Sequence, residues 1–84
     1  MSNQKYKCPC CGYLTLEAMG DYDICPVCFW EDDPYQAGHP DAAGGANRLS
    51  LKESRENYIK FGACEERFLC HVRKPKEEET EENA

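Results

Sequence analysis

The sequence predicts a small α+β domain stabilised by a metal ion, with zinc-ribbon or rubredoxin-like knuckles, a β-hairpin, a long loop and one or two short helices. Two Cys-x-x-Cys pairs, separated by residues 12–24, carry this prediction, because such spacing is typical of four thiolates around one tetrahedral ion. A chain of 84 residues also has a marginal hydrophobic core and commonly needs a metal or disulfides for stability. The predicted ligands are Cys8, Cys11, Cys25 and Cys28.

Each cysteine pair begins Cys-Pro, which is typical of a metal-binding knuckle. In the first knuckle, Pro9 fixes φ at the turn, and Gly12 permits the positive φ that directs backbone N–H groups toward the sulfurs. Phe29 stands where the second knuckle would normally have Gly, so we expect less regular N–H···S bonding there. Residues 13–17 and 22–24 predict two strands of a hairpin that returns the second knuckle to the first.

The segment after the second knuckle, residues 31–48, is rich in Asp, Pro, Gly and Ala and shows no periodicity. A loop of this length is uncommon in a small domain, and we expect it to wrap the surface or to carry function. Four polar side chains in this loop and the following helix are expected to hydrogen-bond backbone groups, with a contact surface for a partner as the alternative. They are Asp32, Asp33, Asn47 and Asn57.

A capping-box pattern formed by Ser50 and Glu53 predicts a helix from about residue 51 to residue 61. Its apolar face contains Leu51, Ser54, Tyr58 and Phe61. Gly62 is placed to end the helix in a left-handed conformation, and residues 65–72 predict a second short helix or turn.

Three parts make up the predicted organisation of the chain. Residues 1–7 form a polar lead-in in which Tyr6 is placed to begin a short strand, and residues 8–75 form one domain. Residues 76–84 contain a run of like charges and are expected to be a disordered acidic tail.

Charge is distributed unevenly along the chain, whose net charge is −6. Residues 8–47 contain seven Asp or Glu and no Lys or Arg, whereas residues 48–76 contain eight Lys or Arg and four Glu. A four-thiolate zinc site would add further negative charge to the acidic part. Because an acidic lobe repels phosphates, nucleic acid is an unlikely partner, and another protein is the expected one.

The expected compartment is the cytoplasm. The first seven residues lack the apolar run of a secretory signal, and no stretch has the roughly 18 apolar residues of a membrane helix. In a reducing compartment, Cys-x-x-Cys pairs bind metal or do redox chemistry rather than form structural disulfides. We therefore expect no membrane association. The sequence assigns no oligomeric state.

The predicted ion is Zn²⁺, and iron is the alternative. Both ions accept four thiolates in tetrahedral geometry, so the spacing does not separate them. Irregular N–H···S bonding around Phe29 favours zinc, because a redox site depends on such bonds more than a structural site does.

Five other potential ligands have no assigned role: Cys10, His39, Cys64, Cys70 and His71. Cys10 lies inside the first knuckle and is expected to be a partly buried knuckle residue, with an oxidisable thiol near the metal as the alternative. His39 is expected to be a surface or turn residue.

The sequence contains few features that indicate an enzyme. No Ser or Cys nucleophile has a base at a recognisable spacing, and no phosphate-binding loop is present. A metal closed by four cysteines also leaves no open position for water or substrate. We therefore predict no catalytic residues.

Four stretches carry a family resemblance: CPCCGYLTL, DYDICPVCFWEDDPYQ, GANRLSLKESRENYIKFGACEERFL and HVRKP. Together they resemble the cysteine-rich CPCC family of small, mostly bacterial proteins, from about Cys8 to Pro75. The resemblance implies a zinc-binding domain and brings no activity with it. It makes Cys10 a motif residue, whereas Cys64 and Cys70 do not occupy motif positions.

Three functional hypotheses follow. The first is a structural-zinc module that binds another protein. The second is a rubredoxin-like iron electron carrier. The third is a nucleic-acid-binding zinc ribbon that uses basic side chains in and before the helix, namely Arg48, Lys52, Arg55 and Lys60.

Overall fold

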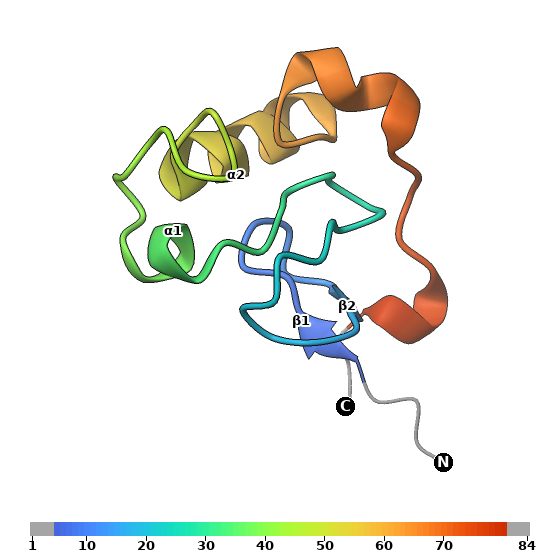
Figure 1. Ribbon diagram of the computed structural model, residues 1–84. Coiled ribbons are helices and arrows are strands. Elements are labelled where there is room, and N and C mark those ends of the chain that lie inside the picture. The colour runs from blue at the N-terminus through green and yellow to red at the C-terminus, as the bar shows by residue number, and fades with distance from the viewer. Residues whose placement is uncertain (1–4, 81–84) are drawn as a thin grey trace.

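Short helices and strands joined by irregular segments make up the fold (Figure 1). The computed structural model describes residues 5–80. In chain order the elements are β1 (Tyr6–Lys7), β2 (Leu14–Leu16), α1 (Pro34–Gly38), α2 (Leu51–Phe61) and the 3-10 helices η1 (Glu66–His71) and η2 (Glu77–Glu79). In Figure 1, α2 and η1 lie on one side of the cysteine-bearing loops and the β1–β2 hairpin lies on the other. The α+β class is therefore confirmed.

The β-hairpin has a different pairing from the predicted one. β1 pairs antiparallel with β2, with Tyr6 opposite Leu16, so the first knuckle itself connects the two strands. Residues 22–24 form no strand with β2. Ile24 instead makes an isolated antiparallel bridge with Glu31, across the second knuckle. The prediction was wrong because each knuckle closes its own short ladder: β1 and β2 flank the first knuckle, and Ile24 and Glu31 flank the second.

Helix α2 begins and ends as predicted. The Ser50 side chain accepts a hydrogen bond from the backbone N–H of Glu53, and the Glu53 carboxylate accepts one from Ser50 N, 3.1 Å away. Gly62 ends the helix with φ of 96° and donates its N–H to Tyr58 O. The predicted apolar face is corrected at its last position, since Phe61 is exposed. These caps set the length of α2.

The long segment after the second knuckle is more ordered than predicted, because it contains α1. Asp33 caps this helix by accepting hydrogen bonds from Tyr35 N and Gln36 N, and its other oxygen accepts from Ala46 N at 3.0 Å. The bond from Ala46 N, together with those from Gln36 N and Tyr35 N, lowers the pKa of Asp33 although burial opposes the shift. Pro34 at the first helical position is favourable because the missing N–H has no partner there anyway.

A buried polar network joins this segment to the rest of the domain. The Gln36 side chain is fully buried and donates to the carbonyls of Ala42, Asn47 and Leu49. The Asn47 side chain bonds both the N–H and the carbonyl of Glu31, at 2.9 and 2.8 Å. The expectation that Asn47 bonds backbone groups is therefore confirmed, whereas Gln36 was not among the predicted residues.

The two other members of the predicted polar set also bond the backbone. Asp32 Oδ2 accepts from Gly20 N at 2.6 Å, and Asn57 Nδ2 donates to Cys64 O at 3.0 Å. The first bond joins residues 12 apart in sequence, and the second ties α2 to the segment that directly follows it.

The C-terminal part departs from the predicted disordered tail. The predicted second helix corresponds to η1, and the chain then returns toward β2, where η2 lies. Arg73 makes a two-pronged ion pair with Glu79, with N–O distances of 2.9 and 2.7 Å. Residues 77–79 are thus ordered, while the rest of the predicted tail after residue 80, and residues 1–4 of the lead-in, lie outside the described residues. Within residues 5–80, no helix is long and apolar enough to cross a membrane.

Two glycines offer a matched test of the helix C-cap. A Cβ added at Gly62 or at Gly38 would meet no atom within 4 Å, but only Gly62 has a positive φ. We predict that Gly62→Ala lowers the free energy of unfolding of the metal-loaded protein by about 1–2 kcal/mol, because an L-residue is strained there. Gly38→Ala is the control and is expected to leave it unchanged or to raise it by less than about 1 kcal/mol. Urea denaturation measures both, and equal losses would contradict the account.

Candidate metal centre

The two knuckles are copies of one local structure, offset by 17 residues (25 minus 8). The backbone N–H of Cys8 donates to Tyr13 O at 2.9 Å, and that of Cys25 donates to Trp30 O at 3.0 Å. Each knuckle therefore folds back on its own first cysteine and presents its two thiols on one side. This repeat follows from the two Cys-Pro-x-Cys sequences.

The fifth residue of each knuckle adopts the same left-handed conformation. Gly12 has φ of 84° and Phe29 has φ of 70°, and each donates its N–H to the carbonyl of the first cysteine at 2.8 Å. This conformation costs a non-glycine residue about 1–2 kcal/mol. At Phe29 the cost is offset by packing, because its ring lies 4.8 Å from Phe68 and 5.0 Å from His71.

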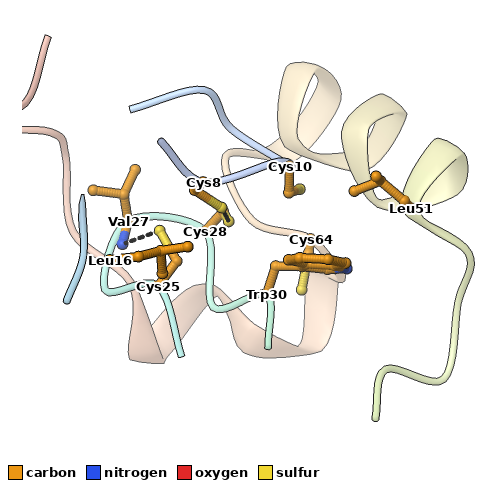
Figure 2. Close-up of a cluster of buried hydrophobic side chains, with 9 residues drawn as sticks. All are labelled: Cys8, Cys10, Leu16, Cys25, Val27, Cys28, Trp30, Leu51 and Cys64. Carbon is orange, nitrogen blue, oxygen red and sulfur yellow. Dashed lines mark hydrogen bonds between the residues drawn. The ribbon is translucent and has the colours of Figure 1, made fainter. Parts of the chain in front are cut away.

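Contrary to expectation, N–H···S bonding is found in the second knuckle. Val27 N donates to Cys25 Sγ at 3.4 Å, the dashed line in Figure 2. Among residues 5–80 it is the one backbone N–H···S hydrogen bond recorded. Phe29 and Gly12 share the left-handed conformation, yet in the described part of the chain only the second knuckle has such a bond, so the residue type at this position does not decide the N–H···S bonding.

The structure brings together the four cysteines predicted as ligands. Their sulfurs lie within 4.8 Å of one another. The Sγ–Sγ distances across the knuckles are 3.6 Å for Cys8–Cys28 and 3.7 Å for Cys11–Cys25. A tetrahedron with metal–sulfur bonds of about 2.3 Å has edges of about 3.8 Å. These cysteines are therefore positioned to bind one metal ion, and the geometry suits zinc and iron equally.

Solvent reaches the four sulfurs unequally. Cys8, Cys25 and Cys28 are fully buried, and Cys11 is half-buried. Figure 2 shows the buried cysteines packed with Leu16, Val27, Trp30 and Leu51. Such a shell excludes water from three sides of the site.

Thr15 supports the cluster and was missed by sequence reasoning. Its hydroxyl lies 3.0 Å from Cys25 Sγ, so Cys25 has hydrogen-bond partners in both Thr15 and Val27. Partners of this kind orient a ligand and tune its basicity. The available signal was a polar β-branched residue between Leu14 and Leu16 in a strand beside a knuckle.

Electrostatics within the cluster favour a cation. Hydrogen bonds from Cys11, and then from Cys28 and Cys8, lower the pKa of Cys25, while the bond to Cys25 raises the pKa of Cys11. Ionisation of all four thiols at these distances requires a positive ion between them.

The remaining cysteines and histidines do not join the four-sulfur cluster. Cys10 is buried and occupies the position that Val27 holds in the second knuckle, which is a packing position. Burial raises the pKa of Cys64 to about 12. Cys70 is exposed, and all seven cysteines are free thiols. His39 stacks on Tyr35 with the ring centres 4.0 Å apart, and His71 stacks on Phe29.

A family model described as Cysteine-rich CPCC matches residues 6–79. The chain belongs to the cysteine-rich CPCC family. The CPCC match includes both knuckles, α2 and the η2 segment, so it extends beyond the domain of residues 8–75 expected from the sequence. No curated protein matches the chain.

A cleft of about 1260 Å³ lies beside the four-cysteine cluster, between the hairpin, the second knuckle and η2. Leu14, Ile24 and Pro26 contribute apolar surface to it. Ion pairs line it as well: Lys5–Glu17 at 2.7 Å and Arg73–Glu79 at 2.7 Å. Asp23, Lys76 and Glu78 line it too, so three basic and four acidic side chains surround the cleft and its net charge is small.

The ligand set is tested by two cysteine variants. We predict that Cys25→Ser abolishes metal binding and cooperative folding, because one thiolate is lost and binding is coupled to folding. Cys10→Val is the matched control. It should keep one metal ion per chain, since Val27 occupies the equivalent position. Elemental analysis and circular dichroism measure both properties, and loss of the metal from Cys10→Val would show the ligand set to be wrong.

Proposed function

We propose that the chain is a structural-zinc module whose activity is to bind another protein. The closed four-cysteine cluster is the observation that carries this proposal. Four protein sulfurs complete a tetrahedral coordination shell, and three of them are fully buried. A metal held in this way has no open position for water or substrate and serves the fold. Activity is then expected on the surface that the metal stabilises.

The same reasoning supports a protein without catalytic activity. His39 and His71 both stack on aromatic rings, and His39 Nδ1 lies 2.9 Å from the carbonyl of Tyr35. Among residues 5–80, neither histidine is hydrogen-bonded to a Ser, Thr or Cys side chain that it could activate. We also propose a reducing, cytoplasmic setting, because seven free thiols and a thiolate metal site are stable there.

An iron electron carrier is the second candidate. Cys11, the half-buried sulfur, would give electrons a short route to solvent, and four thiolates accept iron as readily as zinc. Zinc remains our proposal, because iron–sulfur sites tune their potential through hydrogen bonds to sulfur, and the described residues provide few.

Nucleic-acid binding has weaker support. Two of the four basic residues considered for it are engaged within the protein: Arg55 donates to Pro9 O at 2.9 Å, and Arg48 pairs with Glu65 at 3.0 Å. Burial would raise the pKa of Glu65, but hydrogen bonds from Arg67 and Arg48 outweigh it, and this pKa is lowered. Arg48 and Arg55 are thus bound to acceptors within the protein.

Elemental analysis and the visible spectrum of the purified full-length protein test the metal assignment. We expect one zinc per chain and a colourless protein, because closed tetrahedral thiolate sites suit zinc. A red protein that contains iron and undergoes reversible reduction would establish the electron carrier instead. Affinity purification of the zinc-loaded protein is expected to recover a specific partner, and reproducible substrate turnover without any partner would contradict the interaction module.

A further inference from the structure

Exposed apolar side chains gather on the acidic part of the protein. Among residues 5–80, eight large hydrophobic side chains are exposed, and four of them belong to residues 19–24 and 34–35. These four are Met19, Tyr22, Ile24 and Tyr35, with 60%, 51%, 49% and 61% of their surface exposed. Methionine and tyrosine are enriched at protein interfaces, so this set is unusual for a surface that only meets solvent.

Hydrogen bonds hold the two segments against each other. Tyr22 N donates to Asp32 O at 3.2 Å, and Gly20 N donates to Asp32 Oδ2. A Cβ on Gly20 would lie 3.4 Å from the Pro34 ring, which is van der Waals contact. Residues 19–24 therefore lie directly beside residues 31–35. We call the four exposed apolar side chains on these segments, with Asp21, Asp23 and Glu31, the acidic aromatic face.

Tyr22 has a backbone conformation that is uncommon for a bulky residue. Its φ is 62°, in the left-handed region that is strained for a bulky residue. At Phe29 the same strain is offset by two ring contacts, but no ring contact of Tyr22 occurs among the described residues, and its side chain is half exposed. The strained backbone thus presents a tyrosine ring to the outside, and strain retained in this way is associated with binding sites.

Charge defines the partner. The sequence from Cys8 to Asn47 contains no Lys or Arg, and a divalent metal bound by its four thiolates would add negative charge to this part of the protein. Three basic side chains line the cleft beside Asp23 and Ile24, namely Lys5, Arg73 and Lys76. Two of them are paired with carboxylates, Lys5 with Glu17 and Arg73 with Glu79, both at 2.7 Å. Phosphate-bearing partners are repelled, whereas Lys and Arg gain attraction from the carboxylates and from the tyrosine rings.

We propose that the acidic aromatic face docks a segment of a partner protein in which Lys and Arg alternate with apolar residues. This inference rests on the proposed function as an interaction module and specifies its surface and partner. The apolar side chains of the segment would cover Met19, Tyr22, Ile24 and Tyr35, and its cations would lie near Asp21, Asp23 and Glu31.

An NMR titration of the full-length, zinc-loaded protein tests the proposal. The probe is a short synthetic peptide in which Lys and Arg alternate with Leu and Phe. Amide shifts are expected at residues 19–24 and 31–35. A peptide with Glu in place of Lys and Arg should not bind, and one with Ser in place of Leu and Phe should bind at least about tenfold more weakly. Shifts centred on α2 or η1, or equal binding of the Ser peptide, would overturn the proposal.

Variants separate binding from stability. Tyr22→Gly relieves the strained φ, so it should leave the free energy of unfolding unchanged or raise it. The same variant should bind the peptide of alternating Lys or Arg and Leu or Phe at least about fivefold more weakly. Ile59→Ser is the matched control, because Ile59 is 85% exposed on α2, and it should bind as the parent does. Undiminished binding by Tyr22→Gly would contradict the proposal.

Two further outcomes distinguish this proposal from the function on which it rests. Shifts that appear on dilution without peptide, in both the face and residues 48–76, would identify a second copy of the chain as the occupant and refute the partner proposed here. If Tyr22→Gly still recovers from cells the same partner as the parent protein, the acidic aromatic face is refuted as the docking surface, whereas the interaction module is not. Substrate turnover without a partner would refute the interaction module itself.

Discussion

The gathering of four sulfurs between two knuckles is the interaction on which the rest of the structure depends. Five of the nine residues in the buried cluster are cysteines, and the apolar contribution comes from Leu16, Val27, Trp30 and Leu51. A core of this size rarely supplies more than about 3–5 kcal/mol, whereas structural zinc contributes about 10–16 kcal/mol in small peptides. A metal ion bound by the four sulfurs would therefore be the largest stabilising term in the described part of the chain, and the apolar side chains would chiefly keep water from it.

The surrounding elements attach to the knuckles through polar contacts. In both knuckles, the backbone carbonyl of the proline after the first cysteine accepts a hydrogen bond from an arginine. Pro9 O accepts from Arg55 Nε, and Pro26 O accepts from Arg73 N. Cys64 N donates to Cys28 O. Where the metal does not reach, Gln36 and its amide partners replace a hydrophobic core by satisfying buried backbone groups. A small protein thus combines one strong centre with many directional bonds.

Local patterns in the sequence predicted the parts that local physics determines. Ser50, Glu53 and Gly62 act on their own helix, so both ends of α2 could be predicted. Cysteine spacing likewise selected the four clustered sulfurs. Strand pairing could not be predicted, because strands of two and three residues carry too little pattern to define a register. The role of Gln36 depends on partners from residue 42 to residue 49, which only the folded chain brings together.

Zinc titration of the metal-free, full-length protein, followed by NMR, tests the central claim most directly. If one ion bridging two knuckles holds the fold, the metal-free spectrum shows poor dispersion, and native dispersion returns in full at one zinc per chain. Well-dispersed signals from both knuckles and α2 in the metal-free protein, or recovery only after a second ion is added, would contradict the claim.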